Sequence, residues 1–86
     1  MQDGAGPSGD DLDTAGRLRF ERLRRWRLEL ARAEARPAFT VFDDRTLREL
    51  ATHAPRSVTE LLRMRGVGPV KAARYGDAVI RVLHDV

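Results

Sequence analysis

The segment of residues 57–75 constrains the fold more than any other part of the sequence. It reads as two helices joined by Gly66-Val67-Gly68, in which the two glycines are one residue apart. Glycine adopts backbone conformations that other residues avoid, so this pair lets the chain reverse within a few residues. Pro69 follows, where the first turn of a helix tolerates a missing N–H group. The segment therefore predicts a tight helix-hairpin-helix element.

The same hairpin carries most of the candidate binding residues. Unpaired N–H groups at a helix N-terminus, here those of Val70 and Lys71, attract phosphate together with the helix dipole, and flanking cations add full charges. The candidates for nucleic-acid binding on this segment are Arg63, Arg65, Gly66, Val67, Gly68, Val70, Lys71 and Arg74. The alternative is that Gly66 is only a helix C-cap and that the cations only solubilise the surface. A short glycine motif by itself does not decide between the two interpretations.

The length of the chain limits it to one small domain. Its 86 residues, 42% of them hydrophobic, are enough for one core. The sequence has no cysteine and only two histidines, so disulfides, metal sites and cofactors are not expected. No apolar run approaches the roughly 20 residues of a membrane span, and no signal-peptide pattern begins the chain. We therefore expect a cytoplasmic protein that has no contact with membranes.

Charge divides the chain into two parts. Residues 1–16 contain four aspartates and no Lys or Arg, whereas residues 17–86 carry all 16 cations against the nine other acidic residues. We therefore expect residues 1–16 to be a flexible acidic linker and residues 17–86 to be the folded domain. A basic domain of this kind favours a polyanionic partner.

Helical periodicity covers most of residues 17–53. Apolar residues at spacings of three and four predict a first helix from Arg17 to near Ala35, with Trp26 on its inward face. Pro37 ends this helix, and residues 38–42 are expected to form an extended crossing whose aromatic rings fill the bundle. A second helix is expected at residues 44–53, capped by Asp43.

The remaining helices follow from capping signals. Ser57 and Glu60 have capping-box spacing and predict a third helix with Leu61, Leu62 and Met64 facing inward. The last helix runs from Pro69 to near the C-terminus, with Gly76 as a possible kink, and its predicted inward residues are Val70, Ala73, Tyr75, Ala78, Val79, Val82 and Leu83. The predicted fold class is all-α, a compact bundle of four to five helices with a helix-hairpin-helix-like element.

Three fragments in this order resemble one known module. They are Leu23-x-x-Trp26-Arg27, then Pro37-Ala38-Phe39-Thr40-Val41-Phe42-Asp43-Asp44-x-Thr46-Leu47, then Leu61-x-x-Met64-x-Gly66-Val67-Gly68-x-x-Lys71-x-x-x-Tyr75-Gly76. This arrangement is similar to the HRDC domain, which is shared by RecQ helicases, some UvrD-like helicases and RNase D. The resemblance covers all of the chain except the acidic segment and the first turn of the first helix.

The resemblance implies an auxiliary nucleic-acid-binding module without catalysis of its own, in a larger enzyme of the bacterial RecQ type. Its expected partners are single-stranded or branched DNA and the enzyme's own helicase core, and we expect a monomer. Ala38-Phe39 stands where many family members have Pro-Tyr, so a hydroxyl is missing. Phe39 keeps the ring needed to stack on an unpaired base, which makes it a further candidate binding residue.

Several alternatives remain open from the sequence. The domain could instead be a regulatory module that docks on the helicase core or on a partner through the face of the first helix. The parent enzyme could also be UvrD-like or an RNase D. The arginines of the first helix could face DNA or only solvent, since neighbouring glutamates can pair with them. A stand-alone helix-hairpin-helix reader is disfavoured, because such proteins usually duplicate the motif or form dimers. The scattered acidic residues do not form a nuclease constellation.

Overall fold

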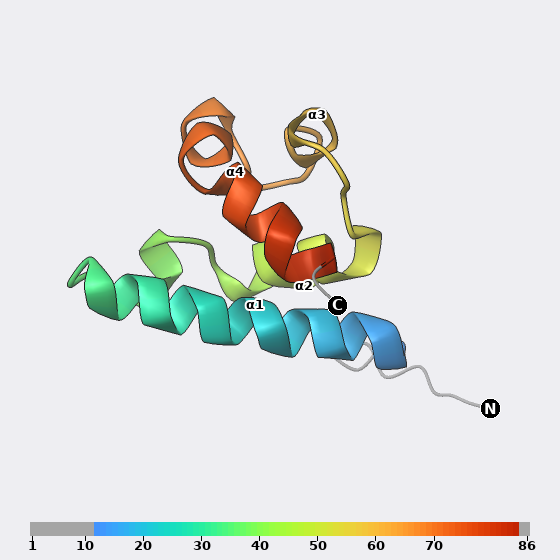
Figure 1. Cartoon of the computed structure of the whole chain (residues 1–86), viewed down its shortest axis with the longest axis horizontal. Coiled ribbons are helices and arrows are strands. Elements are labelled where there is room, and N and C mark those ends of the chain that lie inside the picture. Colours follow the sequence, from blue (N-terminus) through green and yellow to red (C-terminus); the bar gives the residue numbers. More distant parts are fainter. Residues whose placement is uncertain (1–11, 85–86) are drawn as a thin grey trace.

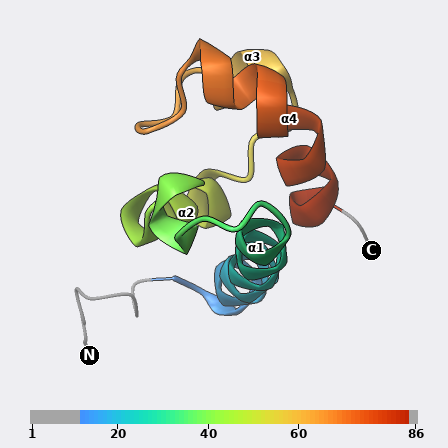
Figure 2. The ribbon, with the colours of Figure 1, turned by 90° about the vertical axis from the view of Figure 1, so that its left-hand side faces the viewer.

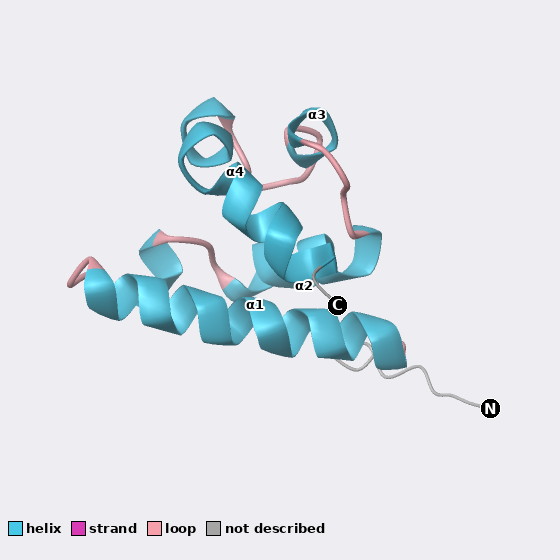
Figure 3. Ribbon diagram, viewed as in Figure 1, coloured by secondary structure: helices cyan, strands magenta, loops and turns pink. Residues whose placement is uncertain are grey.

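The computed structural model describes residues 12–84, and every regular element within this range is helical (Figures 1 and 3). The elements are α1 (Thr14–Ala33), the 3-10 turn η2 (Ala38–Thr40), α2 (Asp44–His53), α3 (Val58–Leu61) and α4 (Pro69–His84). The all-α prediction is therefore confirmed. The expected linker character of residues 1–11 lies outside the described residues.

Helix α1 is displaced towards the N-terminus relative to the prediction. It begins at Thr14 because the Asp13 Oδ1 atom accepts a hydrogen bond from the Gly16 N–H group at 2.7 Å, and Leu12 before it is buried in the core. The folded region thus includes residues that we expected to belong to the linker. The helix ends two residues early, at Ala33. Ala35 adopts a left-handed conformation, with φ of 54°, which glycine usually supplies at a helix end.

The segment after α1 is a helical turn, and the prediction of an extended crossing was wrong. The N–H group of Val41 donates to the Ala38 carbonyl at 3.0 Å, and the Thr40 hydroxyl donates to the Pro37 carbonyl at 2.6 Å. The turn sends the two phenylalanines in different directions. Phe42 is buried, as expected, whereas the side chain of Phe39 is 69% exposed.

Helix caps explain the next two elements. Helix α2 has the predicted bounds, and the Asp43 Oδ1 atom accepts from the Thr46 N–H group at 2.8 Å. In α3 the Ser57 Oγ atom accepts from the Glu60 N–H group at 3.2 Å, while Glu60 accepts from the N–H group of Arg56 at 2.8 Å. The reciprocal bond of the capping box therefore goes one residue upstream of its usual donor. Leu61 is buried and Met64 half-buried, but Leu62 is exposed, contrary to the prediction.

Helix α4 is continuous through Gly76, so it is not broken into two helices there. Its ribbon changes direction between its orange first part and its red last part (Figures 1 and 2). Gly76 is buried beside Leu61 and Val58 of α3, where an added Cβ atom would lie 3.4 Å from each of these two side chains. Two residues predicted to face inward, Val70 and Ala73, are exposed instead. The buried positions of this helix are Ala72, Tyr75, Gly76, Val79 and Leu83.

The helices share one core above α1. Helices α2 and α4 both pack on α1, and α3 packs on α4 (Figure 2). Trp26 lies at the edge of this core, with its ring 6.2 Å from that of Phe42 and 6.0 Å from that of Tyr75. The prediction that Trp26 packs against the core is therefore confirmed.

Candidate nucleic-acid interface

The glycine hairpin is held against the first turn of α2. Gly66 has φ of 86°, and a Cβ atom at this position would collide with the hydroxyl of Thr46. Val67 is buried, so only its backbone could reach a ligand. Gly68 differs from Gly66, because a Cβ atom there would meet nothing within 4 Å. Gly66 therefore anchors the hairpin, and Gly68 presents bare backbone to solvent.

The N-terminus of α4 follows directly after this open position. The N–H group of Ala72 donates to the Gly68 carbonyl at 2.9 Å. The N–H groups of Val70 and Lys71 precede that first intrahelical bond, as expected for the first turn of a helix. The side chain of Val70 is 76% exposed. The start of α4 therefore presents N–H groups that have no intrahelical acceptor, at a helix end that is exposed to solvent.

Lys71 lies between an aromatic ring and a carboxylate. Its Nζ atom is 5.3 Å from the centroid of the Phe42 ring, a cation–π arrangement. The hydrogen bonds from Thr46, followed by the charges of Lys71 and Arg45, hold the pKa of Asp43 below its ordinary value. Asp43 is a neighbour of Lys71 that sequence reasoning did not connect with the hairpin.

Arg74 lies one turn further along α4 and also has an acidic neighbour. Its guanidinium stacks over the Tyr75 ring at 5.5 Å, and its Nη2 atom is 3.7 Å from the Glu34 Oε1 atom. Glu34 is one of the glutamates near the arginines of the first helix, and sequence reasoning did not connect it with Arg74. No spacing within the sequence marks this contact, because it depends on how α4 packs on α1.

Arg36 connects this end of α4 to the η2 turn. It donates to the Thr40 hydroxyl at 2.9 Å and to the Thr40 carbonyl at 3.2 Å, and it also donates to the Tyr75 hydroxyl at 3.3 Å. The η2 turn and the start of α4 consequently lie at the same end of the molecule, on the left of Figure 1 and facing the viewer in Figure 2. The η2 turn, which includes Phe39, thus lies at the end of the molecule where α4 begins.

The other two candidate cations lie on the loop between α3 and α4. Arg63 and Arg65 are both exposed, and neither has an ion-pair partner within residues 12–84. Glu60, the acidic residue nearest to them in the sequence, accepts from the backbone N–H group of Arg56.

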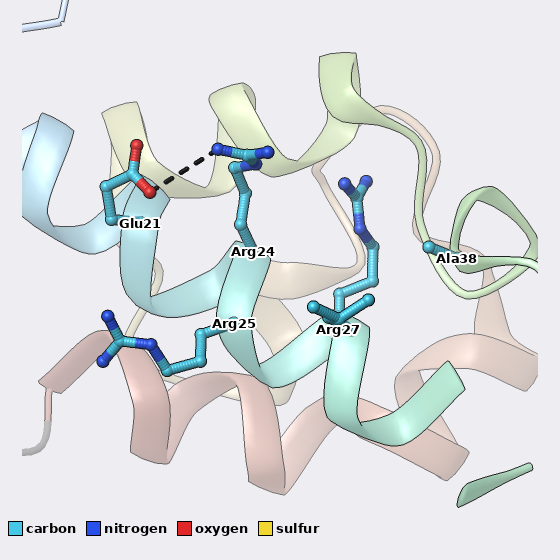
Figure 4. A pocket seen from close by; sticks show the side chains of 6 residues that line it. Glu21, Arg24, Arg25, Arg27 and Ala38 are labelled. Atoms are coloured by element: carbon cyan, nitrogen blue, oxygen red, sulfur yellow. Dashed lines mark ion pairs between the residues drawn. The ribbon is translucent and has the colours of Figure 1, made fainter. Parts of the chain in front are cut away.

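A second group of cations lines an open depression of about 290 Å³ on α1 (Figure 4). Its lining residues are Glu21, Arg24, Arg25, Arg27, Leu28 and Ala38. Arg24 forms an ion pair with Glu21 at 3.6 Å. Arg27 donates to the Phe42 carbonyl and to Asp44, both at 2.9 Å, and its side chain is only 11% exposed. Arg27 is therefore bound within the protein, whereas Arg24 and Arg25 are exposed.

The described part of the chain holds neither a metal-binding cluster nor a membrane-spanning helix. Within residues 12–84, no three His, Cys, Asp or Glu side chains are grouped so that they could hold a metal ion. No helix in the same range is long and apolar enough to cross a membrane. His53 and His84 lie in the last turns of α2 and α4, and Asp43 and Asp44 serve as a helix cap and an ion-pair partner.

Known proteins with similar sequences are DNA helicases. The ATP-dependent DNA helicase RecQ of Bacillus subtilis is 47% identical over 57 residues, which are 66% of this chain and 10% of that protein. RecQ of Haemophilus influenzae is 38% identical over 66 residues, 77% of this chain and 11% of that protein. The ATP-dependent DNA helicase UvrD2 of Mycobacterium tuberculosis is 34% identical over 61 residues, 71% of this chain and 9% of that protein. No solved structure gives a significant match.

The helical fold and these relatives define the class of small accessory domains found in DNA helicases. The HRDC domain model matches residues 17–83, and the chain therefore belongs to the HRDC domain family. This chain spans about a tenth of the length of the relatives it matches.

Proposed function

We propose that this chain is the nucleic-acid-binding module of a cytoplasmic RecQ-type DNA helicase and that it acts as a monomer on single-stranded or branched DNA. One observation carries the proposal. The ring of Phe39 is 69% exposed at the same end of the molecule as the cationic N-terminal half of α4. An unpaired base and its flanking phosphates need that combination of an exposed ring and phosphate donors.

Different residues of the interface contact the bases and the phosphates of the nucleic acid. Phe39 stacks on a base, while Lys71, Arg74 and the backbone N–H groups at the start of α4 contact phosphates. Arg63 and Arg65 add unpaired positive charge on the adjoining loop. Val67 contributes no side chain, because it is buried. Contacts of this kind position a strand without reading its sequence, so we expect little sequence preference.

Fluorescence anisotropy with labelled single-stranded, duplex and forked oligonucleotides tests the proposal at ~50 and ~200 mM salt, since phosphate contacts weaken steeply over this range. We expect saturable binding that favours the single-stranded or forked probe. The double variant Lys71→Glu/Arg74→Glu should lose binding by at least about ten-fold, because it reverses two charges beside the phosphates.

Arg81→Glu is the matched control for the charge reversals. Arg81 is exposed in the last turn of the same helix, far from the hairpin. Arg81→Glu changes the net charge by two units, as Lys71→Glu alone does, so it is compared with that single variant and should bind nearly as well as the unchanged chain. Equal losses in Arg81→Glu and Lys71→Glu would mean that net charge and not this interface drives binding. Absence of binding at ~50 mM salt would refute the proposal.

A second candidate function is docking on a protein, such as the helicase core of the same enzyme. The observation that favours it is on the outer face of α1, where Leu18 and Leu28 are both exposed and Leu28 lines the depression of Figure 4. Replacing both leucines by Ser should then weaken association with the core in calorimetry and leave binding of oligonucleotides unchanged.

A further inference from the structure

Three donor groups converge on one carboxylate oxygen at the proposed interface. The Glu34 Oε1 atom accepts from the Arg36 Nη1 atom at 3.1 Å and from the Tyr75 hydroxyl at 3.3 Å, and it lies 3.7 Å from the Arg74 Nη2 atom. The Glu34 side chain is about three-quarters buried. It is the only carboxylate in residues 12–84 that forms ion pairs with two arginines.

Glu34 stands at a position that does not favour an acidic residue. It is the C-cap of α1, where the carbonyl groups of the helix end concentrate partial negative charge. Negative side chains are unfavourable there, and cations are favourable. The two arginines are therefore what makes a carboxylate tolerable at this helix end.

The two arginines that pair with Glu34 differ in how strongly other contacts constrain them. Arg36 is fixed by further hydrogen bonds to Thr40 and to Tyr75. Arg74 has a longer contact with Glu34, and its side chain is 56% exposed. A guanidinium recognises carboxylate and phosphate oxygens with the same donors. A phosphate approaching from solvent can therefore compete with Glu34 for Arg74, whereas it cannot displace Arg36 as easily.

We propose that Glu34 is an internal competitor of the nucleic-acid phosphate at Arg74 and so lowers the affinity of the interface. The inference rests on the proposed function of the same surface. As a consequence, this domain binds nucleic acid more weakly than its cations would otherwise allow. A phosphate of the bound strand can contact Arg74 only by displacing the Glu34 carboxylate.

The variant Glu34→Gln tests the inference, because glutamine still accepts hydrogen bonds from Arg36 and Tyr75 but has no charge. Anisotropy titrations at ~50 mM salt should show an affinity for single-stranded oligonucleotide about two- to five-fold higher, the range expected for release of one partly exposed ion pair. The slope of log K against log salt should steepen by up to about 0.7, the value for one more phosphate contact on a single strand.

Glu29→Gln is the matched control, since Glu29 is exposed on the same helix and has no ion-pair partner within residues 12–84. It changes the net charge equally and should raise the affinity much less. The gain from Glu34→Gln should also disappear in an Arg74→Ala background. Thermal unfolding of each variant verifies that it is folded.

The outcomes separate this inference from the proposed function. The unchanged chain can bind while Glu34→Gln shows no gain in affinity, or the same gain as Glu29→Gln. Either result overturns the inference and leaves the proposed function standing. A weaker Glu34→Gln overturns it too, because Glu34 would then position Arg74 for binding. Absence of binding by the unchanged chain and by Glu34→Gln overturns both.

Discussion

Two regions of this small domain contain clusters of arginine or lysine, and these cations differ in how exposed they are and in how tightly they are bonded within the protein. On α1 the side chain of Arg27 is 11% exposed and bonded to Asp44 and to a backbone carbonyl. At the hairpin end Arg74 is 56% exposed and has a longer ion pair. Among residues 12–84, Phe39 of the η2 turn is the most exposed aromatic residue, whereas Trp26 of α1 packs against the core. The comparison teaches that a count of cations does not locate a binding surface, because buried partners decide which cations are available.

The largest expected effect distinguishes the two glycines of the hairpin. Gly66→Ala should destabilise the domain by about 2–4 kcal/mol, because it combines an unfavourable positive φ with a collision against Thr46. Such a loss is comparable with the whole stability of a domain of this size, typically ~3–5 kcal/mol. Urea denaturation monitored by circular dichroism measures this loss of stability.

Gly68→Ala is the control for Gly66→Ala. A Cβ atom at residue 68 meets open space, so this variant should change stability by less than about 0.5 kcal/mol. Equal destabilisation by both substitutions would contradict the division of roles between the two glycines.

The next effect concerns the arginines of α1. Arg27→Met should cost about 1–3 kcal/mol of unfolding free energy, because it leaves the Phe42 carbonyl and Asp44 without their donor. Arg24→Met should cost less than about 0.5 kcal/mol, since its ion pair with Glu21 is exposed. Denaturant titration of both variants checks the difference. A large loss of DNA affinity in folded Arg27→Met would break the comparison, because Arg27 would then belong to the interface.

A change confined to binding is expected at the exposed ring. Phe39→Ala should weaken binding of single-stranded DNA by about 1–3 kcal/mol, the range for loss of one stacked base. It should leave thermal stability nearly unchanged, because the ring is mostly in solvent. Unchanged affinity in Phe39→Ala would remove the stacking role.

The smallest effect is the pH dependence of the α2 cap. The pKa of Asp43 is lowered in the folded state, so its carboxylate stabilises the fold above the ordinary pKa of 3.8, and this contribution is lost as the pH falls through the lowered value. Asp43→Ala should cost about 1 kcal/mol at neutral pH. The difference between the two proteins should shrink below about pH 4 in denaturant titrations. A difference independent of pH would mean that the charge of Asp43 is not involved.

The sequence alone predicted much of this fold, and its errors have identifiable causes. The bounds of α2 were correct because Asp43 and Pro55 mark them. The end of α1 was misplaced because Ala35 adopts a conformation that glycine usually signals. Phe39 and Leu62 were expected to be inward, since apolar character does not reveal which way a short turn presents its side chains. Both residues lie in or next to helical segments of only one or two turns, which are too short to show which side chains face inward by their periodicity.

The candidate site was predicted in part. The hairpin residues and Phe39 were singled out, and the η2 turn that includes Phe39 lies at the same end of the molecule as the start of α4. Their role in binding remains a prediction. The sequence did not predict that Val67 would be buried or that Glu34 would face Arg74.

The sequence by itself determined the helix caps, the hairpin and the amphipathic faces of the long helices, because each of these signals acts between residues within about one turn of one another. The tertiary structure alone decided which groups far apart in the sequence meet. Glu34 and Tyr75 are separated by 41 residues, and Arg27 reaches the Phe42 carbonyl across 15. Such contacts depend on how the helices pack on a shared core, and that packing determines which cations stay free for a nucleic acid.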